Sequence, residues 1–188
     1  MFKVIDLETT GLLDNDEIAQ LATWTLDENL NPIDYSNRFF SVHKEVDEGA
    51  RKCNGLTKSI LEIKSNGVYF DDVKDEIYEE LKDYILIAHN ASFERRMLGN
   101  ALDHKLDNNK WICTMLRYTP TLALRDRAGK GGYKHCSLRE LTNYALSLRG
   151  VTSEQLLNLY AKNTGSVGGY HDALYDTFCT AFAFNTLG

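Results

Sequence analysis

Two acidic residues stand two positions apart near the start of the chain, at Asp6 and Glu8. The stretch Phe2 to Leu7 predicts a buried strand, and side chains two apart on a strand share a face. Asp6 and Glu8 would then point the same way while Leu7 enters the core. Carboxylates this close repel unless a cation lies between them, and Mg²⁺ and Mn²⁺ prefer such oxygen ligands. Taken alone, the spacing favours the simpler alternative of two solvent-facing acids at a strand end.

A second polar group follows the apolar run Ile85 to Ala88 and reads His89-Asn90-Ala91-Ser92-Phe93-Glu94. The run predicts a short buried strand, and Ser92 is a candidate cap for the helix that follows. His89 and Asn90 could serve only in the turn and in capping.

A third group, His171-Asp172-Ala173-Leu174-Tyr175-Asp176, opens the predicted closing helix. A histidine near its free pKa is suited to taking a proton from water near neutral pH. His171 could equally be an ordinary polar residue at a helix start, and Asp172 could simply favour the positive end of the helix dipole. Asp172 and Asp176 lie four residues apart on one helix face, so both are candidate ligands.

These three segments resemble the three signatures of the DEDDh 3′–5′ exonucleases, in the order of that family and over nearly the whole chain. The stretches Ala88 to Leu98 and Trp111 to Met115 look most like the exonuclease X subgroup. The resemblance implies an RNase H-like α/β fold, with a mixed central sheet of about five strands flanked by helices. Residues 49–61 would form the connecting helices of the family.

The resemblance also assigns roles to individual residues. Two Mg²⁺ or Mn²⁺ ions would be held by Asp6, Glu8, Glu94 and Asp176, with His171 as the general base; the motif spacing selects Asp176 over Asp172. The terminal nucleotide would contact Thr9, Thr10, Gly11, Leu12, Asn90 and Phe93. Leu12 and Phe93 could stack against bases, although both could instead be packing residues. The expected products are nucleoside 5′-monophosphates from 3′ ends, with DNA favoured over RNA and single-stranded DNA or 3′ overhangs as substrates.

Position 94 departs from the family pattern, which has aspartate there. Glutamate is one methylene longer, and a misplacement of about 1 Å can cost roughly 100-fold in rate. Glu94 is therefore either a working ligand in a modified site or a sign of impaired metal binding. Impairment would make the chain a catalytically weak domain that binds nucleic-acid ends or a partner protein. A purely structural use of the fold is a further alternative. The retained His171 favours the enzyme, because a binding module needs no general base.

The remaining composition sets the context for this site. The 188 residues favour one exonuclease domain over residues 1–188. The net charge of −6 gives no general attraction for phosphate, so binding must depend on local groups and cations. One stretch, Arg125 to Arg139, is basic and could guide the phosphates of a strand or be an ordinary solvated loop.

The expected location is the cytoplasm. Four scattered cysteines without a CxxC pair fit a reducing compartment and argue against a zinc site. The N-terminus has acids where a signal peptide would need an apolar run, and no apolar stretch is long enough to span a membrane. Some relatives form homodimers, but no pattern in the sequence decides the oligomeric state.

Several further elements are predicted from periodicity and capping signals. They are strands over Leu21–Leu26, Arg38–Val42 and Trp111–Met115, a helix through Val73, Ile77 and Leu81, capped helices after Ser137 and Thr152, and a closing helix from Asp172.

Overall fold

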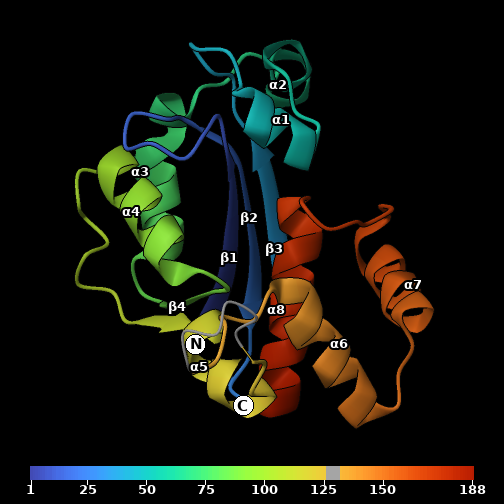
Figure 1. Cartoon of the computed structure of the whole chain (residues 1–188). Coiled ribbons are helices and arrows are strands. Elements are labelled where there is room, and N and C mark those ends of the chain that lie inside the picture. The colour runs from blue at the N-terminus through green and yellow to red at the C-terminus, as the bar shows by residue number, and fades with distance from the viewer. Residues whose placement is uncertain (126–131) are drawn as a thin grey trace.

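A computed structural model describes residues 1–125 and 132–188 of the protein. Its centre is a sheet of five strands, the number expected from the sequence, and their order is β3-β2-β1-β4-β5 (Figure 1). The strands are β1 Phe2–Thr9, β2 Ile18–Leu26, β3 Pro32–Phe39, β4 Ile85–Ala88 and β5 Trp111–Cys113. The first three pair antiparallel, whereas β1 with β4 and β4 with β5 pair parallel, so the sheet is mixed.

Helices cover both faces of this sheet (Figure 1). Those described are α1 Glu48–Asn54, α2 Lys58–Ser65, α3 Phe70–Leu81, α4 Ala91–Ala101, α5 Thr114–Leu122, α6 Leu138–Arg149, α7 Ser153–Thr164 and α8 Ala173–Leu187. α3 and α4 lie on one side, α6, α7 and α8 lie on the other, and α1 and α2 sit at one end of the sheet.

The alternation of side chains along β1 divides the core into two layers. Val4 packs with residues of α6, α7 and α8, including Leu141, Tyr160 and Phe178. Ile5 and Leu7 point the other way and pack with residues of α3 and α4. Asp6 and Glu8 lie two and four residues after Val4 on the same strand, so their side chains share its face and point to the side that α8 occupies. The register of β1 and β2 shifts between Glu8 and Thr9, where the strand pair ends.

The capping signals in the sequence predicted helix starts correctly in two cases. Ser137 with Glu140, and Thr152 with Gln155, form reciprocal capping boxes at α6 and α7. Ser92 was wrong as a cap, because Asn90 is the N-cap of α4 and Ser92 lies in its first turn, donating to Asn90 Oδ1 at 2.9 Å.

Two strand predictions were wrong in extent. The strand expected at Arg38–Val42 is β3, which begins at Pro32 directly after the turn and ends at Phe39. This edge strand is largely exposed, so it lacks the apolar pattern that marks a buried strand. The strand expected at Trp111–Met115 ends at Cys113, and α5 begins at Thr114 without a polar cap.

Part of the basic stretch, residues 126–131 with Arg127 and Lys130, lies outside the described residues. Within the described part, no helix is both long enough and apolar enough to cross a membrane.

Candidate active site

Three carboxylates converge at the end of β1. Asp6, Glu8 and Asp176 each offer an oxygen, and these atoms all lie within 4.8 Å of one another. Asp6 and Glu8 come from one face of β1, and Asp176 comes from the first turn of α8, which packs against that face. A strand and a helix that are over 160 residues apart in sequence are thus brought together by the core beneath them.

The backbone before α8 separates the roles of the two aspartates at its start. Asp172 is the N-cap, and its Oδ1 accepts from the backbone N–H groups of Leu174 and Tyr175 at 3.1 and 3.2 Å. Asp176 Oδ2 accepts from the backbone N–H of His171 at 3.0 Å, whereas its buried Oδ1 has no partner in the described residues. Asp176 therefore keeps an oxygen without a partner among the described residues inside the close carboxylate group, to which Asp172 does not belong.

Glu94 approaches from the opposite layer. It lies in the first turn of α4 with only 3% of its surface exposed, and its Oε2 has no hydrogen-bond partner among the described residues. Its oxygens are not part of the group that lies within 4.8 Å. The structure thus brings three of the four predicted ligands together and leaves the fourth, the one that departs from the family pattern, buried beside them.

Burial and mutual repulsion raise the pKa of all four carboxyl groups. Burial is the main cause for Asp6, whose pKa lies well above its usual value, followed by repulsion from Asp176, Glu94 and Glu8. Burial and then repulsion from Asp176 raise the pKa of Glu8 to about 7, against a hydrogen bond from Asn54. Burial raises the pKa of Glu94 to about 8 and that of Asp176 to about 7.

These observations fit a divalent-cation site. All the donors are carboxylate oxygens, which Mg²⁺ and Mn²⁺ prefer, and two of the buried oxygens have no partner in the part of the chain that the structure describes. A buried carboxylate without a partner is costly, and a cation between the groups would offset the cost of desolvation and the repulsion.

His171 lies at the rim of this site. Its backbone has a positive φ of 69°, unusual for a residue other than glycine, and its side chain is exposed. Together with Asp176 and Arg139 it lines a cavity of about 380 Å³. The turn therefore does two things: its N–H fixes Asp176, and its imidazole borders the space beside that carboxylate.

The residues of the second motif divide into structural and accessible ones. His89 is held on both ring nitrogens, by Thr114 Oγ1 at 3.1 Å and the Cys136 carbonyl at 3.0 Å, and burial lowers its pKa. It thereby ties β4 to the start of α5 and the segment before α6. Asn90 is exposed beside Phe93, which is half-buried.

The loop after β1 is shaped by buried hydroxyl groups. Thr10 is fully buried, and its hydroxyl contacts Asp16 Oδ1 at 3.3 Å and accepts from the backbone N–H of Glu17 at 2.9 Å. Thr9 donates to the carbonyl of Gly11. A Cβ at Gly11 would collide with the carboxylates of Asp16 and Asp47, so any larger residue there would have to displace these side chains.

The same loop presents Leu12 to solvent, with 74% of its surface exposed. Arg96 of α4 fixes it: the guanidinium donates to the Leu12 carbonyl at 2.9 Å, pairs with Asp14, and lies 5.5 Å from the centre of the Phe93 ring. Leu12 and Phe93 border a largely apolar cavity of about 500 Å³ that Glu8, Thr9 and Gly11 also line. The expected nucleotide contacts Thr9, Gly11, Leu12 and Phe93 thus meet beside Glu8, whereas Thr10 lies beneath them.

Asn54 belongs to this site, although no catalytic signal in the sequence marked it. It is the last residue of α1, and its Nδ2 donates to Glu8 Oε2 at 3.0 Å. The expectation of connecting helices in this region placed the segment but not the contact.

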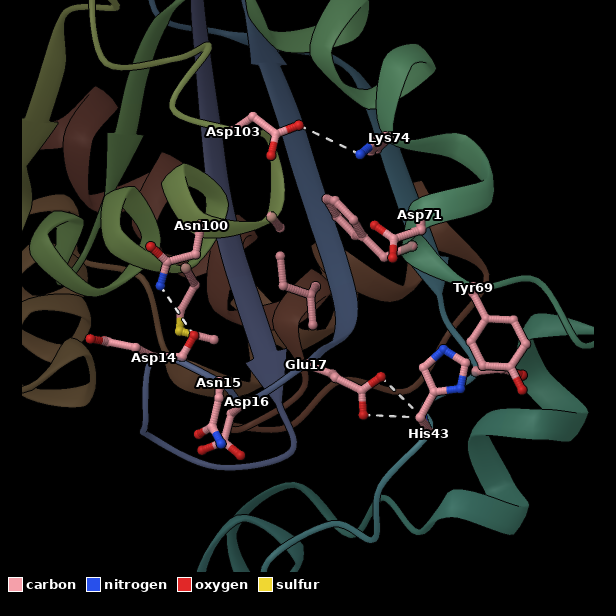
Figure 2. Close-up of a pocket in the computed structure, with 15 residues that line it drawn as sticks. Asp14, Asn15, Asp16, Glu17, His43, Tyr69, Asp71, Lys74, Asn100 and Asp103 are labelled. Carbon is pink, nitrogen blue, oxygen red and sulfur yellow. Dashed lines mark hydrogen bonds and ion pairs between the residues drawn. The ribbon is translucent and has the colours of Figure 1, made fainter.

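A separate cavity of about 290 Å³ lies away from the four acids (Figure 2). Its polar groups are mostly paired with each other: Glu17 accepts from the backbone N–H of His43, Lys74 pairs with Asp103, and the His43 ring stacks on Tyr69 at 4.4 Å. The polar side chains of this cavity therefore bind mostly to one another.

Comparison with known proteins identifies the family. A family model described as Exonuclease, of the RNase T type, matches residues 4–184. The chain belongs to this exonuclease family. The expected membership among DEDDh-type 3′–5′ exonucleases is confirmed. The chain is 32% identical over 103 residues to the 3′–5′ exonuclease DinG of Staphylococcus epidermidis, covering 54% of this chain but 11% of that protein.

Solved exonucleases share the fold. Exonuclease X in complex with 5′ overhanging duplex DNA matches with a TM-score of 0.64 at 21% identity. The match covers 98% of this chain and 89% of the exonuclease X chain. E. coli Exonuclease I in complex with a dA16 oligonucleotide matches with a TM-score of 0.71 at 17% identity. The match covers 99% of this chain and 40% of the Exonuclease I chain. The RNase H-like fold is thereby confirmed, and the narrower likeness to exonuclease X stays a prediction.

Proposed function

We propose that this exonuclease domain, spanning residues 1–188, is a metal-dependent 3′–5′ exonuclease that releases nucleoside 5′-monophosphates, with DNA favoured over RNA. The observation that carries the proposal is the convergence of Asp6, Glu8 and Asp176 within 4.8 Å, where the buried Oδ1 of Asp176 lacks a hydrogen-bond partner among the described residues. Structural acids seldom collect in this way, because each raises the cost of ionising the others.

The ligand set of the proposal is Asp6, Glu8, Glu94 and Asp176, holding two Mg²⁺ or Mn²⁺ ions. Such a pair supplies an activated water and stabilises the attacking and leaving oxygens of a phosphodiester. Glu94 lies outside the 4.8 Å group but repels Asp6 and is repelled by Glu8, so a rotation about its extra side-chain bond would bring its carboxylate to a shared cation.

The protein's own residues hold and orient the substrate. The apolar cavity between Leu12 and Phe93 receives the terminal nucleoside, since stacking on apolar or aromatic side chains tolerates any base. Glu8 lines that cavity, so the 3′-terminal phosphodiester comes to lie against the carboxylates. His171 then takes one proton of the attacking water as its oxygen bonds to phosphorus and the bond from phosphorus to the 3′-oxygen breaks. The phosphate stays on the released nucleotide, and the 3′-oxygen stays on the shortened strand, where a proton from solvent makes it a hydroxyl. Asn90 lies at the N-terminus of α4, near Phe93, as a further contact.

Charge explains how an acidic protein could accept a polyanion. The four carboxylates would repel phosphate by themselves, whereas cations held between them reverse the local sign. The substrates proposed are single-stranded DNA and 3′ overhangs, because the apolar cavity accepts an unpaired base. The location proposed is the cytoplasm, which the scattered, unpaired cysteines fit.

A second candidate is a catalytically weak domain that binds nucleic-acid ends. The observation that favours it is the exclusion of Glu94 from the close carboxylate group. Replacement of Glu94 by aspartate distinguishes the two, because it restores the residue of the family pattern without changing charge.

The test uses a 5′-labelled single-stranded DNA and the RNA of the same sequence, incubated in Mg²⁺, Mn²⁺ or EDTA. The proposal predicts a metal-dependent ladder that shortens from the 3′ end, is faster on DNA, and is lost in His171→Ala. If the wild type leaves both strands intact while Glu94→Asp cuts them, the weak-binding alternative is correct.

A further inference from the structure

Arg139 lies beside Asp176 of the carboxylate group, in a cavity separate from the apolar one. It is an exposed residue in the first turn of α6 and lines the cavity of about 380 Å³ that Tyr170, His171 and Asp176 also border. This cavity shares no lining residue with the apolar cavity that Leu12, Phe93 and Glu8 border.

The guanidinium is held by stacking rather than by an ion pair. Its central carbon lies 4.8 Å from the centre of the Tyr170 ring, and Tyr170 in turn packs edge-on against the buried Tyr175 at 5.4 Å. The adjacent acid, Glu140, is engaged by Ser137 and by Lys134 at 2.6 Å. Among residues 1–125 and 132–188, no carboxylate lies within 4.0 Å of the Arg139 nitrogens. A stacked guanidinium keeps its hydrogen-bond donors free for an anion.

The two cavities and the carboxylates between them suggest a path for the strand. Glu8 lines one cavity and Asp176 the other, and their oxygens lie within 4.8 Å of each other. A strand whose terminal nucleoside fills the apolar cavity and whose last phosphodiester lies at the carboxylates would bring a phosphate oxygen toward the second cavity. Arginine is suited to that contact because its planar fork binds phosphate oxygens in pairs.

We propose that Arg139, stacked on Tyr170, is a phosphate-binding residue that holds the backbone of the substrate strand beside Asp176. This role rests on the proposed exonuclease function. Lysine at this position would keep the charge but lose the paired geometry, whereas alanine would lose both.

The chain offers a matched control on the same helix. Arg149 ends α6, lies 5.7 Å from the Phe182 ring, and hydrogen-bonds Asn185, so it is also an exposed, stacked arginine. It lines neither of the two cavities beside the carboxylates.

The experiment measures kcat/KM on a 5′-labelled single-stranded DNA across a series of KCl concentrations, with melting curves to verify folding. Arg139→Ala should lower kcat/KM by about 10- to 100-fold, the usual effect of removing a hydrogen bond to a charged group. It should also reduce the slope of log kcat/KM against log salt by about 0.7, one phosphate contact on a single strand. Arg139→Lys should keep the wild-type slope and recover part of the rate, and Arg149→Ala should match the wild type.

Two results would overturn the assignment while leaving the exonuclease function intact. One is an active Arg139→Ala protein with unchanged rate and slope. The other is a slower Arg139→Ala protein whose salt slope equals that of the wild type, which would mean that the residue supports the fold of the turn. A wild type without activity would instead remove the proposed function, and this role with it.

Discussion

Addition of Mn²⁺ should raise the melting temperature of this protein, and by much more at pH 8 than at pH 6. Glu8, Glu94 and Asp176 have pKa values raised to about 7, 8 and 7. Between their unfolded and folded pKa values, the folded protein holds protons that the unfolded chain has lost. The free energy of unfolding of the metal-free protein therefore falls as pH rises through about 7 to 8. A bound cation opposes this loss.

The magnitude follows from binding linkage. Metal at about 100 times its dissociation constant stabilises the folded state by about 2.7 kcal/mol. For a chain of this size, that raises the melting temperature by about 5–11 °C. With a pKa of about 8, Glu94 is about half ionised at pH 8 and about 1% ionised at pH 6. If binding displaces that one proton, affinity falls about 50-fold between pH 8 and pH 6, and the same metal concentration gives a rise of only about 1–3 °C.

The assay is a melting curve followed by circular dichroism, with and without Mn²⁺ at each pH. Asp176→Asn should lose most of the shift at pH 8. Asp71→Asn changes an acid of the separate cavity in Figure 2 and should keep it. Equal shifts at pH 6 and pH 8, or an unchanged shift in Asp176→Asn, would refute the reasoning.

Two other substitutions test how the site is positioned. Arg96→Ala releases the loop that presents Leu12 and should lower kcat/KM on single-stranded DNA about 10-fold. By contrast, Arg95→Ala, whose guanidinium donates to the Asp107 carbonyl, should stay within about twofold. The Arg96→Ala effect should largely disappear in a Leu12→Ala background, since coupled residues are not additive. Asn54→Ala removes a hydrogen bond to Glu8 and should lower kcat/KM about 10-fold. The same substitution should shift the acidic limb of the activity–pH profile to higher pH, because the lost hydrogen bond lowers the pKa of Glu8. An acidic limb at the wild-type pH would count against this role.

Local signals in the sequence located the elements that carry the site. Alternation along β1 put Asp6 and Glu8 on one face, and the capping boxes at Ser137 and Thr152 marked α6 and α7. These features depend on neighbouring residues, so a single sequence contains them. The motif spacing favoured Asp176 over Asp172 as a ligand, but only the hydrogen bonds around the turn at His171 show that Asp172 caps the helix.

Other features depend on contacts between distant segments and could not be read locally. Asn54 meets Glu8 across 46 residues, and Arg96 meets the Leu12 carbonyl across 84. α5 was missed because it starts without a polar cap and contains Pro120, which argues against a helix. β3 was misplaced because an exposed edge strand shows no apolar periodicity.

The central claim is that the carboxylates around Asp176 drive hydrolysis from the 3′ end, and one comparison tests it directly. Wild type, Asp176→Asn and Asp172→Asn are incubated in Mn²⁺ with the same DNA strand labelled at either its 5′ or its 3′ end. The account predicts that the wild type progressively shortens the 5′-labelled strand and releases the 3′ label first as a mononucleotide. Asp176→Asn should be inactive, and Asp172→Asn should stay active because asparagine also caps helices. Release of the 5′ label first, or equal activity of wild type and Asp176→Asn, would contradict the claim.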